Sequence, residues 1–308
     1  MTVVGSGTRA DRIAALAFDY DAQPKQRVER CNLCGTSAFV TLVHRDRYGY
    51  AASAACCSGC GLVFLDPVMT ADAYAAFYEH TYRPLVSAYH GRLIDARTIQ
   101  QEQREYAQER GDLLARAMSG RGYRTLLDIG GSTGIVAHAL ARRFNLSATV
   151  IDPAPLETAE AQALGIETIE GLVERIDLGG RRFDVVALCQ TVDHLLDVAG
   201  TLARIRELLT PEGLFFIDIV DFRAAYLRNW SIQEAVKIDH PYYLTEPVAA
   251  AFLRRAGFDV ERADYAADRL HVSYVARPSS ADRSARPSHA SVDELLREVR
   301  FVQNAPRE

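Results

Sequence analysis

From Thr125 onward, short runs of apolar residues alternate with segments whose apolar positions recur with a helical period. The short runs predict strands at Thr125–Ile129, Ala148–Asp152, Glu167–Ile169, Phe183–Leu188 and Leu214–Asp218. The segments between them predict helices around Ile135–Arg143, Leu156–Leu164 and Val198–Leu209. This alternation is typical of a parallel sheet with helices on both faces, so we expect a doubly wound α/β fold.

Two later strands are expected near Phe258–Tyr265 and Leu270–Ala276. The linker between them, residues 266–269, is too short for a right-handed crossover, so this last pair should be antiparallel. The α/β domain is therefore expected to span residues 120–277.

Three segments precede this domain. Residues 1–24 are expected to form a loose N-terminal arm, and residues 25–66 hold five of the six cysteines. Residues 67–119 predict a helical linker or lid, with a short helix at Asp72–Tyr82. One or two helices then follow over Leu93–Met118, and their narrow apolar stripe indicates that they bridge two parts of the protein.

The last segment, residues 278–308, predicts a flexible linker followed by an amphipathic helix. Arg277–His289 is rich in proline, serine and arginine, and Ser291 with Glu294 fits a capping box at the start of the helix. The helix carries one apolar stripe, made of Val292, Leu295, Leu296, Val299 and Val302. Such a stripe must be buried, either on the body of the protein or in a homodimer formed through this helix.

Four cysteines form two C-x-x-C-G knuckles, Cys31–Cys34 and Cys57–Cys60. Each knuckle presents two thiolates to one ion, and the following glycine tolerates a positive φ. Four thiolates fill the tetrahedral shell of zinc, which predicts a structural Zn²⁺ bound by Cys31, Cys34, Cys57 and Cys60 in a zinc ribbon. Cys56 is the expected odd one out, because Cys57 has the matching spacing.

Strands of this ribbon are expected at Phe39–His44 and Tyr48–Ala52. A redox dithiol would need only one C-x-x-C pair, and a catalytic zinc would keep a coordination position open. His44 is an alternative ligand, although a lone histidine in a strand is more often a surface or core residue. A nucleic-acid-binding ribbon is a further competitor.

Composition and charge narrow the function classes. The 308 residues are 48% hydrophobic and 24% charged, which is ordinary for a globular protein and excludes wholesale disorder. The sequence shows neither an apolar run long enough for a membrane span nor a secretory signal, so we expect a cytoplasmic protein. The net charge of −5, and the absence of a basic stripe in residues 25–66, argue against a nucleic-acid partner.

A glycine-rich loop follows the first strand of the α/β domain. Asp128 lies in the strand end, and Gly130, Gly131 and Gly134 let the backbone approach a ligand closely. Ser132 stands where a dinucleotide-binding motif has glycine, and the G-K-[ST] of a P-loop is absent. Asp128 can receive a ligand ammonium group, directly or through water.

The second strand also ends in an acid, Asp152. A carboxylate there suits a bidentate contact to ribose hydroxyls, and a helix cap or a turn before Pro153 is the alternative.

The motif D-I-G-G-S-T-G, the acidic end of strand two, F-D-V-V-A-L and L-L-T-P-E-G-L-F-F-I-D together resemble the class I S-adenosylmethionine-dependent methyltransferases. The resemblance covers roughly residues 120–277 and implies a seven-stranded sheet whose last strand is antiparallel. It also implies that S-adenosylmethionine is the cofactor, with Gly130 and Gly134 bordering its methionine part. Leu172 would lie near the adenine, and Gln190, after strand four, is also assigned to this site.

A narrower resemblance covers more of the chain. The two knuckles, the motif F-Y-E-H-T-Y-R and the methyltransferase core are similar to zinc-containing methyltransferases of sugar and natural-product pathways, among them the deoxysugar C-methyltransferases. The catalytic positions that this resemblance implies are His194 and the pair Asp239–His240. The sequence departs from that group at Lys237, where those enzymes often have tyrosine, and in residues 278–308, where they carry a further domain.

Methyl transfer needs an acceptor aligned with the sulfonium methyl and a base that removes a proton. His240 and His194 are the candidate bases, for a hydroxyl or for a carbon beside a ketone. Four tyrosines, with Trp230, are candidates to line the pocket of a small-molecule acceptor: Tyr78, Tyr82, Tyr242 and Tyr243. Core packing is an equally open interpretation for each of them. An RNA methyltransferase and a non-catalytic protein-interaction scaffold are the alternative functions.

Overall fold

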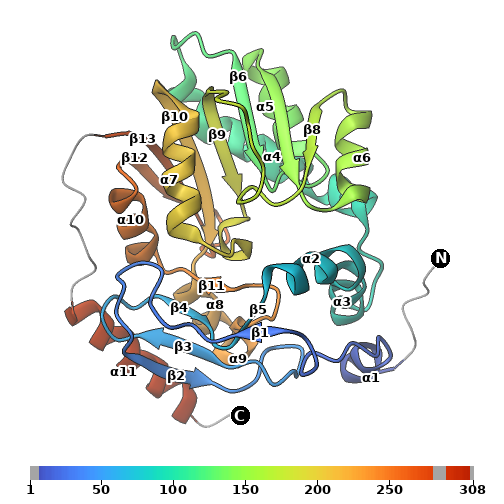
Figure 1. Ribbon diagram of the computed structural model, residues 1–308, viewed down its shortest axis with the longest axis vertical. Coiled ribbons are helices and arrows are strands. Elements are labelled where there is room, and N and C mark those ends of the chain that lie inside the picture. Colours follow the sequence, from blue (N-terminus) through green and yellow to red (C-terminus); the bar gives the residue numbers. More distant parts are fainter. Residues whose placement is uncertain (1–6, 280–288, 306–308) are drawn as a thin grey trace.

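Seven strands form one sheet in the order β12-β13-β10-β9-β6-β7-β8 (Figure 1). The computed structural model describes residues 7–279 and 289–305. Neighbouring strands from β10 to β8 are parallel, whereas β13 is antiparallel to both β10 and β12. The predicted seven-stranded, mostly parallel sheet is thereby confirmed. Its strands are β6 (Thr125–Ile129), β7 (Ser147–Asp152), β8 (Glu167–Glu170), β9 (Phe183–Cys189), β10 (Leu209–Val220), β12 (Phe258–Tyr265) and β13 (His271–Pro278).

Helices cover both faces of this sheet, because its central strands are apolar on both sides. On one face, α4 (Ala96–Met118), α5 (Ile135–Phe144) and α6 (Pro155–Ala163) bury side chains such as Leu114 and Leu140 against the strands. On the other face, α7 (Val198–Leu208) and α10 (Glu246–Arg255) bury Leu202 and Phe252 (Figure 1). The fold is therefore doubly wound, as the alternation of patterns predicts.

A second sheet lies beyond the carboxyl ends of the parallel strands (Figure 1). It contains β2 (Phe39–Val43), β3 (Ala54–Cys57), β4 (Val63–Leu65) and β11 (Tyr242–Tyr243), in the antiparallel order β11-β4-β3-β2. Its fourth strand, β11, comes from the insertion after β10, which also holds α8 (Phe222–Asn229) and α9 (Ile232–Ala235). A two-stranded pair, β1 (Lys25–Gln26) and β5 (Val68–Met69), borders this layer. The cysteine segment and the insertion thus share one sheet.

The expected strand at Tyr48–Ala52 is wrong. The Asp46 carboxylate accepts hydrogen bonds from the backbone N–H groups of Tyr48, at 3.0 Å, and Tyr50, at 2.9 Å. These bonds hold a turn, and the strand begins later, at Ala54. A side chain that bonds its own backbone in this way competes with strand pairing.

The helices before the main sheet also differ from expectation. The single short helix expected at Asp72–Tyr82 is two helices, α2 (Ala71–His80) and α3 (Tyr82–His90). A short helix in the N-terminal arm, α1 (Arg9–Ala14), lies against α3, where Arg12 Nε donates to the carbonyl of Ala88 at 2.8 Å. The expected bridge over Leu93–Met118 is the single helix α4, which packs along α5 and therefore lies with the main sheet.

The C-terminal helix α11 (His289–Asn304) buries its apolar stripe within the same chain. Val292, Leu295, Val299 and Val302 are each less than a tenth exposed, and Leu295 and Val299 share a core with the second sheet and α8. Of the two expected ways to bury the stripe, the structure shows burial on the body of the protein. The proposed linker lies mostly in residues 280–288, and the Ser291 cap depends on its side chain; both lie outside the described residues. No helix in the described ranges has the length and apolar character needed to cross a membrane.

If α4 belongs to the main sheet, Leu114→Ala should cost about 2–5 kcal/mol of unfolding free energy, because this side chain is fully buried between α4 and the strands. Urea unfolding followed by circular dichroism measures the loss. The matched control is Leu156→Ala, at a side chain 77% exposed, for which a change within about 0.5 kcal/mol is expected. Equal losses in the two variants would contradict this packing.

Candidate active site

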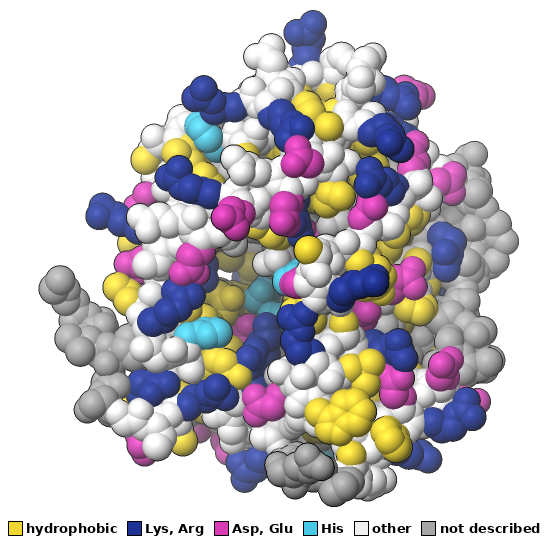
Figure 2. Space-filling model, turned by 180° about the vertical axis from the view of Figure 1, so that it is seen from behind, with side chains coloured by type: hydrophobic (Ala, Val, Ile, Leu, Met, Phe, Trp, Pro, Cys, Tyr) yellow, Lys and Arg dark blue, Asp and Glu magenta, His cyan; other side chains and the backbone are white. Residues whose placement is uncertain are grey.

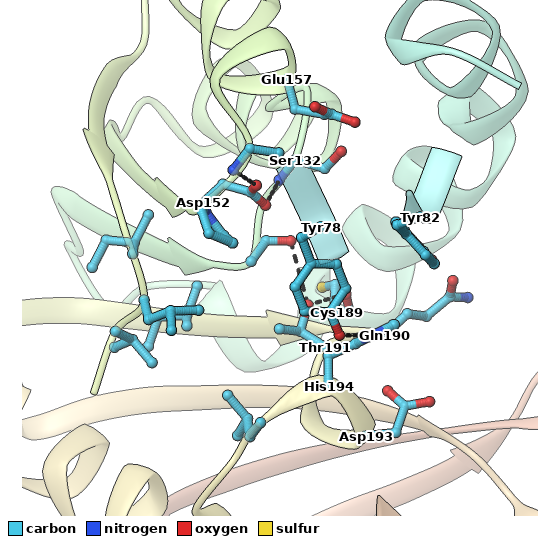
Figure 3. A pocket seen from close by; sticks show the side chains of 18 of the residues that line it. Tyr78, Tyr82, Ser132, Asp152, Glu157, Cys189, Gln190, Thr191, Asp193 and His194 are labelled. Atoms are coloured by element: carbon cyan, nitrogen blue, oxygen red, sulfur yellow. Dashed lines mark hydrogen bonds between the residues drawn. The ribbon is translucent and has the colours of Figure 1, made fainter. Parts of the chain in front are cut away.

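A cavity opens where the carboxyl ends of β6, β7 and β9 meet α2, α3 and the insertion. Figure 2 shows a hollow on one face with histidine visible inside it, and Figure 3 shows Ser132 and Asp152 on the side opposite Asp193 and His194. Ligands of open α/β sheets commonly bind at this edge. The sequence-predicted residues that line the cavity are Gly130, Asp152, Leu172, Gln190, Tyr78, Tyr82, His194 and His240.

The glycine loop makes one end of the cavity. Gly130 has a positive φ of 66°, and a Cβ at this position would overlap the Thr191 side chain. Gly134, at φ 70°, is the N-cap of α5, and a Cβ there would lie 2.8 Å from the Cβ of Ala161. Glycine is therefore required at both positions, and the backbone of the loop is left open to a ligand.

Asp128 lies behind this loop, not on the cavity wall. Its side chain is fully buried, and neither carboxylate oxygen has a hydrogen-bond partner among the described residues. Burial, followed by the negative charges of Asp152 and Asp218, raises the pKa of Asp128 to about 8. Gly131 covers it so closely that a Cβ there would lie 2.9 Å from the Asp128 carboxylate. Of the predicted cofactor residues, Asp128, Gly131 and Gly134 thus shape the loop from behind.

Asp152 faces the cavity from the end of β7. Its two oxygens accept hydrogen bonds from the backbone N–H groups of Ser132 and Ala154, each at 2.9 Å (Figure 3). Burial raises the pKa of this carboxyl to about 6. Nearby, Glu157 is paired with Arg83 at 2.7 Å. Each carboxylate oxygen of Asp152 retains a second lone pair, so the group can still accept hydrogen bonds from a pair of ligand hydroxyls.

A buried ion pair that the sequence did not reveal supports the floor of the cavity. Gln190 holds a positive φ of 51°, and its backbone N–H donates to Asp218 Oδ1 at 2.6 Å. The other oxygen of Asp218 accepts from Arg110 Nε at 2.8 Å, and the Arg110 side chain is almost fully buried. Two features of the sequence could have indicated this ion pair. Arg110 interrupts the apolar stripe of its helix, and Asp218 is an acid within an apolar strand.

His240 is held from both ring nitrogens. Asp193 Oδ2 lies 2.8 Å from Nδ1, so Nδ1 carries a proton and donates a hydrogen bond to the carboxylate. At Nε2, the Lys237 ammonium lies at 3.1 Å and the Asp239 carboxylate at 3.3 Å. Burial opposes ionisation of Asp193, but electrostatic attraction to the His240 ring and the hydrogen bond from it keep the pKa of Asp193 well below its usual range. Asp193 is therefore ionised and fixes the orientation of the His240 ring.

His194 stands beside His240, with the ring centroids 4.5 Å apart. Its Nδ1 lies 2.8 Å from the hydroxyl of Tyr78 and 3.0 Å from the carbonyl oxygen of Asp239. Burial is the largest cause that lowers the pKa of His194, to about 4, so this ring is neutral near pH 7. Nε2 of His194 makes no hydrogen bond to the described residues, which leaves it available to a ligand.

Two residues of this cluster were missed as site residues. Asp193 precedes the predicted His194, and Lys237 was noted only as a departure from a family pattern. Burial lowers the pKa of the Lys237 ammonium, which lines the cavity. The signal for Asp193 was its place in the same loop as His194, but its pairing with His240 spans 47 positions of the chain.

Three aromatic residues expected at the acceptor pocket do not line the cavity. The hydroxyl of Tyr243 accepts from Lys237 N at 2.8 Å and donates to Lys237 O at 2.6 Å, so it fixes the backbone behind the lysine. Tyr242 donates from its hydroxyl to the carbonyl of Leu196 at 3.2 Å. Trp230 is 47% exposed and lies against Phe301. The positions of the two tyrosines follow from the pairing of β11 with β4, which places both in the second sheet.

The four knuckle cysteines converge on one point. Sγ of Cys31 lies 3.5 Å from that of Cys60, and Sγ of Cys34 lies 3.4 Å from that of Cys57. All four sulfur atoms lie within 4.8 Å of one another. Sulfurs around a tetrahedral zinc ion would lie about 3.8 Å apart, from a Zn–S bond of about 2.3 Å. The donor set therefore fits zinc, and Cys56 stands outside it.

Known proteins match parts of this chain. The model of the methyltransferase domain family matches residues 98–263. A ubiquinone biosynthesis O-methyltransferase of Methylobacterium nodulans is 38% identical over 104 residues, 30% of this chain and 39% of that protein. One from Cereibacter sphaeroides is 31% identical over 150 residues, 44% of this chain and 60% of that protein. The chain thus spans less than two thirds of the length of these curated relatives.

Among solved structures, an O-methyltransferase family protein from Burkholderia thailandensis is 18% identical. The match covers 68% of this chain and 63% of that one, with a TM-score of 0.49.

The buried Asp128 predicts a pH-dependent stability. The unfolded chain loses this proton near pH 3.8, whereas the folded protein keeps it up to about pH 8. Between these values Asp128 therefore removes up to about 1.4 kcal/mol of stability per pH unit. Asp128→Asn has no such group, so its unfolding free energy minus that of the wild-type protein should rise from about pH 5 to pH 8.

Urea unfolding at both pH values measures this difference. The exposed Asp72→Asn variant is the control and should run parallel to the wild-type protein, since its side chain is 87% exposed. A parallel course for Asp128→Asn would contradict the prediction.

Proposed function

The chain belongs to the methyltransferase domain family, and we propose that it transfers the methyl group of S-adenosylmethionine to a small-molecule acceptor. One observation carries the proposal. A single cavity has a glycine loop with Asp152 at one end and a histidine–carboxylate cluster at the other. The first end suits a nucleoside with a charged amino acid, and the second end suits removal of a proton from an acceptor.

The residues at the first end fit the cofactor. Asp152 would accept hydrogen bonds from the two ribose hydroxyls, and the open backbone at Gly130 would border the methionine part of the cofactor. Leu172, on the cavity wall after β8, would lie against the adenine. Asp128 has unpartnered buried oxygens behind the loop, which suits an ammonium group reached through water. When bound, S-adenosylmethionine supplies a methyl group already activated by its sulfonium charge.

His240 is the favoured base. Asp193 holds Nδ1–H and so directs the lone pair of Nε2, as the acid does in a carboxylate–histidine pair. The acceptor hydroxyl would replace the Lys237 ammonium at Nε2 and give its proton there. The acceptor oxygen would bond the methyl carbon as the carbon–sulfur bond of the cofactor breaks, and the demethylated thioether would be the leaving group. The resulting imidazolium is flanked by Asp193 at Nδ1 and by Asp239 at Nε2, so both N–H groups face a carboxylate.

His194 has a different role in this proposal. With a pKa of about 4 it is a weak base, but its free Nε2 can hydrogen-bond the acceptor. Tyr78 fixes His194 from α2, and its hydroxyl also lies 2.9 Å from the carbonyl of Asp239. Tyr78, Tyr82 and His194 contact one another ring to ring and form one wall for the acceptor.

The acceptor class follows from the relatives and from the site. The curated relatives are ubiquinone biosynthesis O-methyltransferases, which favours a hydroxyl oxygen. A carbon beside a ketone is the second candidate. The likeness to deoxysugar C-methyltransferases implies that the acceptor binds near the histidines, and Tyr78, His194 and His240 all line this cavity. RNA is disfavoured, since Figure 2 shows basic and acidic side chains interspersed on that face.

We also assign a structural zinc ion to Cys31, Cys34, Cys57 and Cys60. The four buried sulfurs match a closed tetrahedral shell, which leaves no position for a substrate. The zinc-loaded knuckles would stabilise the second sheet and take no part in the bond-making step.

Cofactor binding provides a direct test. Asp152→Ala should weaken S-adenosylmethionine binding about tenfold to hundredfold, the usual loss when hydrogen bonds to a charged group are removed. Isothermal titration calorimetry measures the dissociation constant. Asp177→Ala, at an exposed position, is the control and should leave it unchanged. If the wild-type protein, loaded with zinc, bound neither S-adenosylmethionine nor its demethylated product, the proposed function would be wrong.

Acceptor chemistry should separate from cofactor binding. His240→Gln and Asp193→Asn should keep the cofactor dissociation constant within about threefold and reduce methyl transfer by at least about a hundredfold, as expected for loss of a general base or its orienting partner. Transfer of labelled methyl to a catechol and to a nucleotide-linked ketosugar measures this. His90→Gln, at an exposed histidine, is the matched control. Full activity in His240→Gln would remove His240 from the base role.

A further inference from the structure

The first cysteine knuckle is tied to the loop after β9 through one side chain, that of Asn32. Its Nδ2 donates to Asp197 Oδ1 at 2.7 Å, and its Oδ1 accepts from the backbone N–H of Ala199 at 2.9 Å. Asp197 is the N-cap of α7 and accepts from Gly200 N at 2.9 Å. Asn32 thus completes the cap of a helix that directly follows the loop carrying Asp193 and His194.

The segment that carries His240 is tied to the cysteine layer as well. β11, which begins two residues after His240, pairs with β4 between the second knuckle and Asp66. The N–H of Leu65 donates to the carbonyl of Pro241 at 2.9 Å. Tyr242 then donates to the carbonyl of Leu196, which joins this segment to the loop after β9.

The cofactor end of the cavity is built differently. Its loops are held by their own strands, through Gly130 N to the carbonyl of Ile151 at 2.7 Å and through Ser132 N to Asp152. Within the described residues, no hydrogen bond joins residues 25–66 to the loops at 130–134 or 152–154. The two ends of one cavity therefore depend on different parts of the molecule.

We propose that the metal bound by the four cysteines organises the acceptor side of the cavity, and that Asn32 is the positioning residue that connects it to His194. The inference rests on the proposed function for the zinc site. A four-thiolate metal fixes the turn Cys31–Cys34 and hence the direction of the Asn32 side chain. Loss of the metal should free both histidine-bearing segments and leave the cofactor loops in place.

Hydrogen–deuterium exchange of the full chain tests the proposal in the zinc-loaded protein, in chelator-treated protein and in zinc-loaded Asn32→Ala. Zinc removal should raise exchange roughly tenfold or more in residues 191–200 and 236–244, and leave residues 126–134 unchanged. Asn32→Ala should raise it in residues 191–200 alone, with zinc content intact. Unchanged exchange of residues 191–200 in Asn32→Ala would overturn the role of Asn32, even if the metal-free protein unfolds altogether.

A double-variant cycle sharpens the test. Asp197 Oδ1 accepts from both Asn32 Nδ2 and Gly200 N, and an amide at position 197 cannot serve both partners with that one atom. Asp197→Asn should therefore raise exchange in residues 191–200, and adding Asn32→Ala should raise it by less than the sum of the two single effects, because both changes break the same connection. Asn229→Ala, at an exposed asparagine, is the control. Fully additive effects of Asn32→Ala and Asp197→Asn would count against the proposed connection.

Imidazole ¹H–¹⁵N spectra give a readout that loss of global stability would not move. In zinc-loaded Asn32→Ala, the His194 and His240 signals should shift while the affinity for S-adenosylmethionine stays within about threefold of wild type. Unshifted signals would refute the positioning role. A wild-type protein that takes up no zinc would instead refute the proposed metal site, and the Asn32 variants would still report on the connection itself.

Discussion

The buried contact between the Asp193 carboxylate and His240 Nδ1, 2.8 Å long, is the interaction on which the proposed acceptor side of the cavity depends. It joins the loop after β9 to the insertion before β11, and both side chains are less than a tenth exposed. Removing one partner of such a pair leaves the other charged or polar group buried and uncompensated, which is strongly destabilising. The contact therefore forces two loops from distant parts of the chain to keep one arrangement, and it sets the tautomer of His240.

Three of the parallel strands, β6, β7 and β10, carry a buried carboxylate at or near their carboxyl ends: Asp128, Asp152 and Asp218. Asp218 is compensated by Arg110, whereas burial raises the pKa of Asp128 to about 8 and of Asp152 to about 6. An edge optimised for stability alone would carry apolar side chains here. The energetic cost of burying these carboxylates is consistent with a ligand that brings hydroxyls and positive charge to this edge, as a sulfonium nucleoside does.

The sequence was sufficient for the parts of the molecule that depend on local pattern. Strands such as β10 contain a continuous apolar run, residues 214–217, and the knuckles can be recognised from the spacing of their cysteines. The sequence was insufficient where pairing between distant segments decides the position of a side chain. The pairing of Tyr242 with Phe64 moved two tyrosines out of the expected acceptor pocket, and the Arg110–Asp218 pair joins residues 108 positions apart. Neither contact changes the hydrophobic periodicity of the segments that form it, so neither can be predicted from that periodicity.

The two ends of the cavity also differ in how far the family match covers them. The family match covers residues 98–263 and so includes the proposed cofactor loops, whereas Tyr78, Tyr82 and both knuckles lie outside it. A cofactor end held by its own strands can stay constant while the layer that carries those tyrosines is replaced. In the proposed function, acceptor choice belongs to the cysteine layer, α2 and α3, and the Asp193–His240 pair is the point where that layer meets the methyltransferase core.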